Sequence, residues 1–410
     1  MLFGRSIIVC REGWYYLLVL GFVVTGSFLR EVNLLLVLAG MMFFPFLLNL
    51  RTVIISSRGL TVRRRIPDVV SAGETFHIDL ALSKLPSRFW LGGGASWVIH
   101  AQDKIQPLAK KPEITVPPRL TFWRLAPGQR EDQSYRCCLA DRGRYELGPV
   151  TLSSGFPLGL VRAERRVKSA DHLIVLPRLG QLTNAWRRLY QEVHQGSRAN
   201  HHKHGVSQGE FHSLRDWRPG DSRRRIHWRT TARRGAPVVR QYEQNREQNL
   251  VLLIDAWLPD GVDPVTFEKV VSFASTVVTD ICQRGGSHLY LGLATERPTV
   301  GGGPSSTGLM RELLESLAVL APASVNHLAP LLTVVRETVP PAMTTVILSP
   351  RALDLAVLER EIHRQNDNGR SRFGRIVTIS GDQEIGEYFQ PDVPSAARSV
   401  RRQTEPQMSA

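Results

Sequence analysis

The sequence predicts a membrane-anchored α+β protein: an N-terminal two-helix transmembrane hairpin, a β-sandwich-like domain and an α/β domain with a mostly parallel sheet. Three observations support this fold class. Two long apolar runs open the chain, short segments broken by turn residues follow, and buried strands then alternate with helices. The expected boundaries are 1–51 for the hairpin, 52–180 for the β-rich domain, 181–248 for a linker helix and an arginine-rich motif, 249–385 for the α/β domain and 386–410 for a disordered tail.

The apolar runs, Trp14–Leu29 and Val32–Leu50, are each near the roughly 17–25 residues that cross a bilayer. A cleaved signal peptide is an alternative, but no small-residue cleavage site separates the runs. A buried core hairpin is another, although the runs exceed the usual length of a core helix. The arginines that flank the pair predict, by the positive-inside rule, an inner-membrane hairpin with both termini and the bulk of the chain in the cytoplasm: Arg5, Arg11, Arg51, Arg58, Arg63, Arg64 and Arg65.

The region 52–180 lacks a helical period and carries alternating or β-branched segments between Gly and Pro residues. We expect antiparallel strands over Thr52–Ser56, Phe76–Leu82, Ala95–His100, Leu120–Leu125, Gln133–Leu139, Val150–Leu152 and Leu173–Leu176. A short amphipathic helix and a polar loop follow over 181–207. The loop contains the histidines of segment 200–205, but it lacks the cysteines or spaced carboxylates that would complete a metal shell, so a solvated loop is favoured.

After Asn249 the pattern changes to alternating strands and helices, which predicts a parallel sheet covered on both faces. The expected strands are 250–256, His288–Ala294, Thr344–Ser349 and Arg375–Ser380. The expected helices are Pro264–Arg284, Gly308–Leu320, His327–Val339 and Ala352–Gln365.

The charge balance favours an anionic partner. The chain has 52 Lys and Arg against 37 Asp and Glu, a formal charge of +15, which suits nucleic acid, an anionic membrane surface or an acidic protein. Its four cysteines, at 10, 137, 138 and 282, form no C-x-x-C pair. We therefore expect neither a zinc site nor a disulfide framework, and no cofactor.

The densest motif runs from Gly209 to Gly235, and nine arginines fall between Arg215 and Arg240. A turn at Pro219-Gly220, Asp221 as N-cap and Gly235 as C-cap predict one short helix over 222–232. The tryptophans are expected to anchor the motif to the core, and its aspartates to pair with guanidinium groups. The candidate partner-binding residues are Arg215, Asp216, Trp217, Pro219, Gly220, Asp221, Arg225, His227, Trp228 and Arg233.

Three functions compete for this motif. Arginines interleaved with tryptophans bind nucleic acid through phosphate contacts and stacking. His227 with Asp216 or Asp221 would supply an acid and a base, but no nucleophile or metal shell accompanies the histidine. A structural turn and helix, whose arginines meet carboxylates of the protein or of a partner, is favoured because ion-pair networks are commoner than active sites.

Two landmarks resemble those of the bacterial family catalogued as domain of unknown function 58. The first is Phe-x-x-Leu-Arg-x-Trp-x-Pro-Gly-Asp-x-x-Arg-x-Ile-x-Trp-x-x-x-Ala-Arg, within residues 209–239. The second, at 142–159, ends in Gly-Phe-Pro-Leu-Gly, where the family more usually has Asp-Pro-Phe-Gly. The resemblance implies a membrane-anchored cytoplasmic protein without established enzymatic activity. It also implies a von Willebrand factor A-like C-terminal domain and an association with MoxR-type AAA+ ATPases.

The von Willebrand A group holds a divalent ion through Asp-x-Ser-x-Ser after the first strand. Here Asp255 remains, but Trp257 and Pro259 take the two serine positions and remove both hydroxyl ligands. We therefore expect a degenerate position that binds no metal and whose carboxylate satisfies loop amides. The sequence as a whole predicts a non-enzymatic membrane scaffold or adaptor. A membrane-tethered binder of nucleic acid or anionic lipid is the alternative.

Overall fold

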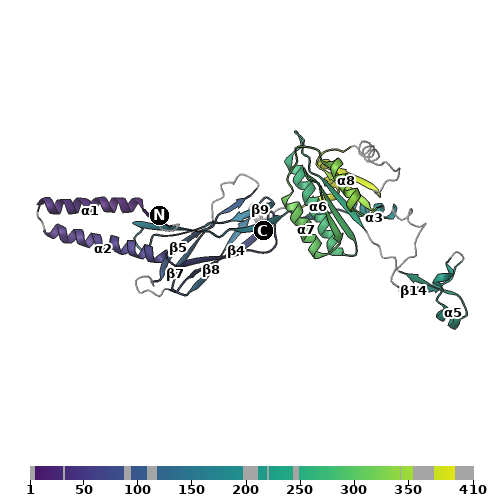
Figure 1. Cartoon of the computed structure of the whole chain (residues 1–410), viewed down its shortest axis with the longest axis horizontal. Helices are drawn as coiled ribbons and strands as arrows, with labels where there is room; N and C mark the ends of the chain where they lie inside the picture. The colour runs from purple at the N-terminus through teal and green to yellow at the C-terminus, as the bar shows by residue number, and fades with distance from the viewer. Residues whose placement is uncertain are drawn as a thin grey trace, which may run out of the picture. The chain divides into compact units, whose positions relative to one another are not determined.

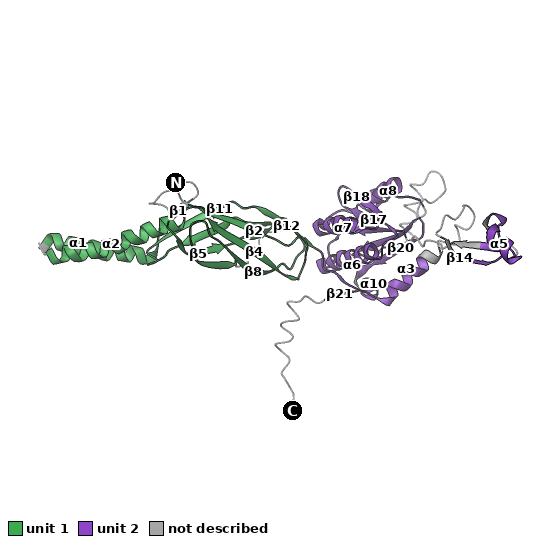
Figure 2. Ribbon diagram, turned by 90° about the horizontal axis from the view of Figure 1, so that it is seen from below, with its two compact units in different colours: residues 1–176, 394–410 green, residues 177–393 purple. Residues whose placement is uncertain are grey.

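The protein has a mixed α+β architecture divided into two compact units. The computed structural model describes residues 5–30, 33–86, 94–108, 118–196, 211–218, 221–242, 249–341, 343–353 and 374–392. Unit 1 contains residues 1–176 and unit 2 contains residues 177–393, with residues 394–410 grouped with unit 1 (Figure 2).

Two apolar helices, α1 (Arg11–Arg30) and α2 (Asn33–Ser56), form the N-terminal hairpin (Figure 1). Both are long and apolar enough to cross a membrane. Their large side chains are mostly uncovered, and Leu29 and Leu34 are 79% and 76% exposed. Exposed apolar side chains at this density fit a lipid environment better than water.

Helix α2 continues through residues 52–56, where we expected a strand. The β-branched residues there suggested extended structure, but Asn49, Val53 and Ser56 are buried at helical spacing, so tertiary burial overrides the local propensity. Lys84 lies at the end of this helix: its buried Nζ donates to the Ile55 carbonyl oxygen at 3.4 Å and to Ser96 Oγ at 2.7 Å. A cation beside the last carbonyls complements the helix dipole.

The rest of unit 1 is built from short strands in three sheets. Their orders are β1-β11-β10-β5-β7, β2-β4-β8 and β3-β12-β9-β6, and within the described residues the paired strands are antiparallel except β3 with β12. The first sheet comprises β1 (Arg5–Val9), β5 (Ser96–Gln102), β7 (Arg119–Leu125), β10 (Val150–Ser154) and β11 (Val161–Val167). The others comprise β2 (Leu60–Arg65), β3 (Val70–Ser71), β4 (Thr75–Lys84), β6 (Ile105–Pro107), β8 (Arg130–Cys138), β9 (Gly143–Leu147) and β12 (Asp171–Leu176).

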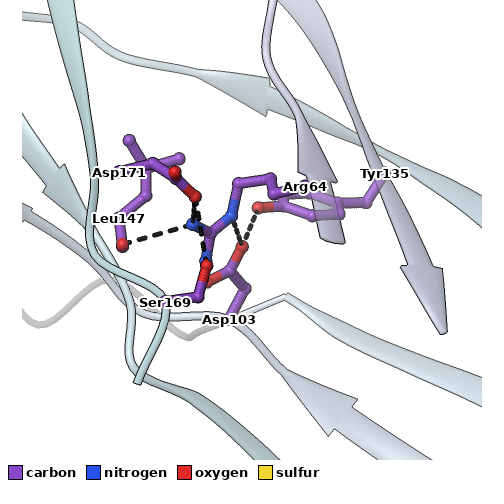
Figure 3. A network of polar contacts seen from close by, with 6 residues as sticks. All are labelled: Arg64, Asp103, Tyr135, Leu147, Ser169 and Asp171. Carbon is purple, nitrogen blue, oxygen red and sulfur yellow. Dashed lines mark hydrogen bonds and ion pairs between the residues drawn. The ribbon is translucent and has the colours of Figure 1, made fainter. Parts of the chain in front are cut away.

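A buried ion-pair network links strands of this region (Figure 3). The guanidinium of Arg64 donates through Nε and Nη2 to both carboxylate oxygens of Asp103, at 2.8 and 2.6 Å, and also pairs with Asp171. Tyr135 donates its hydroxyl to Asp103 at 2.7 Å. The Arg64 and Asp103 side chains are 0% and 2% exposed, so each charge depends on the other for the solvation that burial removes.

Unit 2 contains a mixed five-stranded sheet in the order β18-β17-β16-β19-β20. Strands β16 (Leu250–Asp255), β17 (His288–Ala294), β19 (Thr344–Ser349) and β20 (Ile376–Ser380) pair in parallel, and β18 (Thr299–Pro304) joins β17 antiparallel. The helices α6 (Pro264–Arg284), α7 (Thr307–Val319) and α8 (Leu328–Thr338) lie where the sequence predicts them. The helix predicted for 352–365 lies almost wholly outside the described residues.

The segments flanking this sheet pack onto it. Strand β13 (Gly180–Leu182) pairs antiparallel with β21 (Phe389–Pro391), and α3 (Asn184–Gly196) and α10 (Gly381–Tyr388) lie next to them in sequence. Trp186 of α3 meets Phe273 of α6 edge-on at 5.2 Å, and Phe273 lies 5.5 Å from Phe389. The segment that we expected to be a linker helix and the start of the expected tail therefore belong to unit 2, because these aromatic side chains are buried together.

Candidate functional site

The arginine-rich motif folds into a small β-hairpin with helical turns in its connection, here called the arginine module (residues 211–242). Strand β14 (Phe211–Asp216) pairs antiparallel with β15 (Val238–Tyr242). Figure 1 labels β14 and the helix α5 of this module. A 3-10 turn η2 (Arg223–Arg225) and the helix α5 (Trp228–Arg234) lie between them. Val238 and Val239 are buried, at 0% and 2% exposure.

A planar ion pair closes the module between Arg215 and Asp221. Both terminal nitrogens of the guanidinium donate to the carboxylate, Nη1 to Oδ2 and Nη2 to Oδ1, each at 2.7 Å. Asp221 Oδ2 also accepts from the backbone N–H of Arg218 at 2.9 Å. The hydrogen bond from Arg215 and then the Arg218 N–H lower the pKa of Asp221, so the carboxylate stays charged well below neutral pH.

The prediction of one helix over 222–232 capped by Asp221 is wrong. Asp221 closes the turn with Arg218 instead, and the chain is extended at Ile226, which bridges to Val239 of β15. The backbone N–H of His227 donates to the Val238 carbonyl oxygen at 2.8 Å, so pairing with β15 stops any helix at this point.

His227 takes the role predicted for Asp221 and caps α5. Its Nδ1 accepts from the Thr230 N–H at 3.3 Å and lies 2.8 Å from the Thr230 hydroxyl. The predicted C-cap is confirmed: Gly235 adopts φ 72°, a left-handed conformation that favours glycine. Among the described residues, the His227 side chain hydrogen-bonds with Thr230 and not with Asp216 or Asp221, which gives no support to an acid-base pair.

The two tryptophans differ from the prediction that both are anchors. Trp217 is half-buried, and its indole Nε1 donates to the Asp221 carbonyl oxygen at 3.3 Å. Trp228 is 68% exposed, because α5 has no buried residue and presents this ring to solvent. The module therefore displays an aromatic ring among its arginines.

The remaining predicted residues lie at the surface or outside the description. Asp216, with its side chain 82% exposed, meets Arg234 only at 3.9 Å, and Arg233 is exposed. Pro219, Gly220 and the side chain of Arg225 lie outside the described residues, as does the histidine tract of 200–205.

A second cluster surrounds Asp255 at the carboxyl end of β16. Strand β16 lies between its parallel neighbours β17 and β19, so its end is a topological switch point, where α/β folds commonly bind ligands. The Asp255 carboxylate accepts from the Trp257 N–H at 3.1 Å, from the Ser349 hydroxyl at 3.0 Å and from Arg351 Nε at 3.2 Å. The Arg351 guanidinium also lies over the Trp257 ring, 4.2 Å from its centroid.

These residues do not fit a divalent ion. Asp255 is fully buried, and burial raises its pKa against the lowering effects of the Trp257 N–H, Arg351 and Ser349. A guanidinium already supplies the positive charge, and the one hydroxyl beside the carboxylate is already bonded to it. Throughout the part of the chain that the structure describes, no three His, Cys, Asp or Glu side chains come together as metal ligands.

The sequence missed Arg351 because it lies 96 residues from Asp255 in an unremarkable loop. The signal that was available is positional. Asp255 and Ser349 end two strands predicted to be parallel, and parallel neighbours bring their carboxyl ends to one edge.

Comparisons with known proteins locate the family match in unit 2. Residues 213–349 match the model of a family described as "Protein of unknown function DUF58". The chain is 28% identical over 152 residues to "Uncharacterized protein YeaD" of Bacillus subtilis (strain 168), which covers 37% of this chain. The match spans only 36% of that curated relative.

Likeness to solved structures is slight. A CARDB domain from Pyrococcus furiosus matches 27% of this chain and 92% of its own, with 18% identity and a TM-score of 0.18. A β-glucosidase from Listeria innocua matches 28% of this chain and 15% of its own, with 13% identity and a TM-score of 0.17. At these TM-scores, neither likeness bears on fold or function. The family match over residues 213–349 and the Bacillus relative support the assignment of this part of the chain to the DUF58 family.

Proposed function

We propose that this protein is a membrane-anchored, non-enzymatic scaffold or adaptor whose arginine module docks onto an acidic surface of a protein partner. The observation that carries the proposal is the module's surface. The hairpin presents the 68% exposed Trp228 among exposed arginines. The sequence of residues 211–242 contains nine arginines and only two aspartates, and one of these aspartates, Asp221, already pairs with Arg215.

The chemistry of these side chains suits protein recognition. Arginine forks match carboxylates in a bidentate geometry, and Trp and Arg are the residues that most often dominate binding energy at interfaces. The Arg215–Asp221 pair and the pairing of β14 with β15 fix the module's backbone before a partner arrives. Such pre-organisation reduces the entropy that binding would otherwise cost.

The partner that we propose is a MoxR-type AAA+ ATPase, and this identity rests on the family resemblance. We also infer that the α/β part of unit 2 is von Willebrand factor A-like, and the parallel pairing of β16 with β17 and β19 supports this. The charge asymmetry around α1 and α2 supports placement in the inner membrane with both termini in the cytoplasm.

A membrane-tethered polyanion binder is the second candidate, and the exposure of Trp228 is the observation that favours it. An exposed indole among guanidinium groups is suited to stacking on an unpaired base while the arginines contact phosphates. Removal of the Trp228 ring should weaken binding of the ATPase if the first candidate is right and binding of single-stranded DNA if the second is right. Binding to DNA should also weaken steeply as the salt concentration rises.

The test is binding of the purified full-length protein, in nanodiscs, to the purified MoxR-type ATPase of the same organism. Trp228→Ala should weaken capture at least tenfold. Trp123→Ala, which removes a similarly exposed tryptophan from unit 1 (70%), should leave capture unchanged. Equal capture by wild type and Trp228→Ala, together with a salt-sensitive shift of labelled single-stranded DNA that Trp228→Ala abolishes, would favour the polyanion binder.

A further inference from the structure

The connection between β10 and β11 (residues 155–160, the β10–β11 loop) contacts both N-terminal helices. Asn49 of α2 is fully buried against it: its Nδ2 donates to the Gly155 carbonyl oxygen at 3.3 Å, and its Oδ1 accepts from the Val161 N–H at 3.1 Å. Just before α1, the backbone N–H of Cys10 donates to the Leu160 carbonyl oxygen at 2.9 Å. The loop is thus fixed to both helices at the same end of the hairpin.

Close packing supports this attachment. The Thr52 hydroxyl of α2 lies 3.1 Å from the Phe156 carbonyl oxygen, next to two carbonyl oxygens of its own helix at 2.9 Å. A Cβ placed on Gly13 would lie 2.1 Å from the Leu160 carbonyl oxygen, so α1 approaches the loop as closely as only glycine allows. The landmark Gly-Phe-Pro-Leu-Gly of the sequence is therefore a segment that attaches both helices of the hairpin to the β-sheets.

The contacts also set the depth of the loop relative to the helices. Asn49 and Thr52 flank Arg51, where the apolar stretch of α2 ends, and Cys10 precedes Arg11 at the start of α1. A helix rises about 1.5 Å per residue and each headgroup layer is roughly 5–8 Å thick, so residues 49–52 span about one such layer. If α1 and α2 cross a bilayer, the loop lies at its surface.

The exposed side of the loop has the composition of a membrane interface. Leu158 is 50% exposed in the middle of the loop. The ring of Phe156 stacks on that of Trp97, with 5.6 Å between the centroids. The guanidinium of Arg124 also lies over the Trp97 ring, 5.2 Å from its centroid. The backbone N–H of Trp97 donates to Ser56 Oγ at 3.3 Å, which connects this cluster to the last residue of α2.

We propose that the β10–β11 loop is a membrane-docking element: Leu158 enters the boundary between headgroups and acyl chains of the leaflet next to which the β-sheets lie, and the stacked Phe156 and Trp97 rest in its headgroup layer. Amphipathic aromatic rings favour this layer, and an apolar side chain beside them gains by leaving water. This inference rests on the proposed membrane anchoring of α1 and α2.

Charge specifies the lipid. Exposed arginines gather at this end of unit 1, on α1, α2, the turn after α2, β7 and β11: Arg11, Arg51, Arg58, Arg124 and Arg162. Basic residues next to a membrane-spanning helix are attracted to anionic headgroups, roughly 1 kcal/mol each near the surface. An anionic bilayer is therefore the occupant that complements both the apolar loop and its surroundings.

The experiment uses the full-length chain with its four native cysteines replaced, in nanodiscs of phosphatidylcholine and phosphatidylglycerol. Single cysteines at Leu158, Leu36 and Val69 carry an environment-sensitive fluorophore, and lipids brominated at shallow or deep acyl positions quench it. The three side chains are similarly exposed, at 50%, 52% and 57%. Leu36 reports on α2, and Val69 lies next to β3, in a different sheet from the loop.

We expect the Leu158 label to be quenched at least twofold by shallow bromines. The Leu36 label, inside the apolar stretch of α2, should be quenched by acyl-chain bromines irrespective of leaflet composition, and the Val69 label should be unaffected. Replacing phosphatidylglycerol by phosphatidylcholine should reduce quenching at Leu158 and not at Leu36. Quenching at Leu36 with none at Leu158 overturns membrane docking and leaves the anchoring intact. A Leu158 label that protein contacts shield in the absence of lipid also overturns docking, because the side chain would then not be free to enter the bilayer. No quenching at Leu36 overturns the anchoring itself, and docking with it.

Discussion

The guanidinium of Arg351 contacts both the buried carboxylate of Asp255 and the ring of Trp257. Its Nε lies 3.2 Å from Asp255 Oδ2, and its Cζ lies 4.2 Å from the centroid of the Trp257 ring. Asp255 ends the central strand β16, and Arg351 follows the neighbouring strand β19. The negative charge of the Asp255 carboxylate is thus compensated by an arginine of the same protein. It has consequences for stability and for metal dependence.

Replacing Arg351 by Ala should destabilise unit 2, because the carboxylate of Asp255 would lose its positive partner while remaining buried. Breaking a buried ion pair costs about 3–5 kcal/mol. Since the Arg351 side chain is 21% exposed, we expect about 2 kcal/mol in urea unfolding. Arg284→Ala, which breaks the surface pair with Asp280, should cost less than about 1 kcal/mol. Equal losses in the two variants would contradict the assigned role of Arg351.

Magnesium should not affect the stability of unit 2. A ligand that binds only the folded state raises its melting temperature, and Asp255 already has its oxygens bonded to Trp257, Ser349 and Arg351. Thermal unfolding in chelator and in millimolar magnesium should therefore give the same Tm. An increase of several degrees in Tm with magnesium would show that the metal ion displaces the Arg351 guanidinium from Asp255.

Arg215→Lys should weaken capture of the protein partner although it preserves charge. An ammonium cannot reproduce the two parallel hydrogen bonds to Asp221, so the turn at Arg218 should loosen. We expect a three- to tenfold loss of ATPase binding, with attraction to DNA or anionic vesicles unchanged. Arg130→Lys, which removes a similar two-point fork to Asp132 on β8 and lies outside the module, is the matched control. If Arg215→Lys binds the partner like wild type, the fork does not organise the docking surface.

Lys84 should make the stability of unit 1 depend on alkaline pH. Burial lowers the pKa of Lys84 from 10.5 to about 8. Between these values the unfolded chain holds a proton that the folded chain has lost, so the free energy of unfolding should rise as pH increases through this window. The shift sets a ceiling of about 3 kcal/mol, and the oxygen acceptors around Nζ should reduce the gain to about 1 kcal/mol. Lys84→Met should lack this increment in urea titrations at pH 8 and 10.5.

The fold was predictable where one signal dominated. The strand β17 and the helix α6 begin and end as predicted. Asp263 and Gly285 cap the helix, and leucines recur at alternate positions of the strand. Strands β2 and β11 were missed because arginines run through both and hide the alternation, and one of them, Arg64 of β2, is itself buried. Strand β18 was missed because three glycines interrupt it. A Cβ on Gly302 would lie 2.4 Å from the Leu289 carbonyl oxygen, so close pairing explains that glycine.

The candidate site was predictable in composition but not in geometry. The sequence indicated that guanidinium groups would meet Asp221, and Arg215 does so. It could not show that β15 would draw Ile226 and His227 into strand pairing, because that contact is non-local. Trp228 is the first residue of α5, directly after this break, and it is exposed instead of anchoring the motif.

The pairing of β13 with β21 has a mechanical consequence. Gly180 opposes Pro391 and Leu182 opposes Phe389, so the entry and the exit of unit 2 lie at the same end of an antiparallel pair. Tension between the two ends would load these hydrogen bonds one after another, as in a zipper, and not all at once in shear. The first structure that yields to such a pull would be this short ribbon, followed by the release of Phe389 from Phe273. The attachment of the C-terminal strand is thus the part of unit 2 that is most easily opened by force.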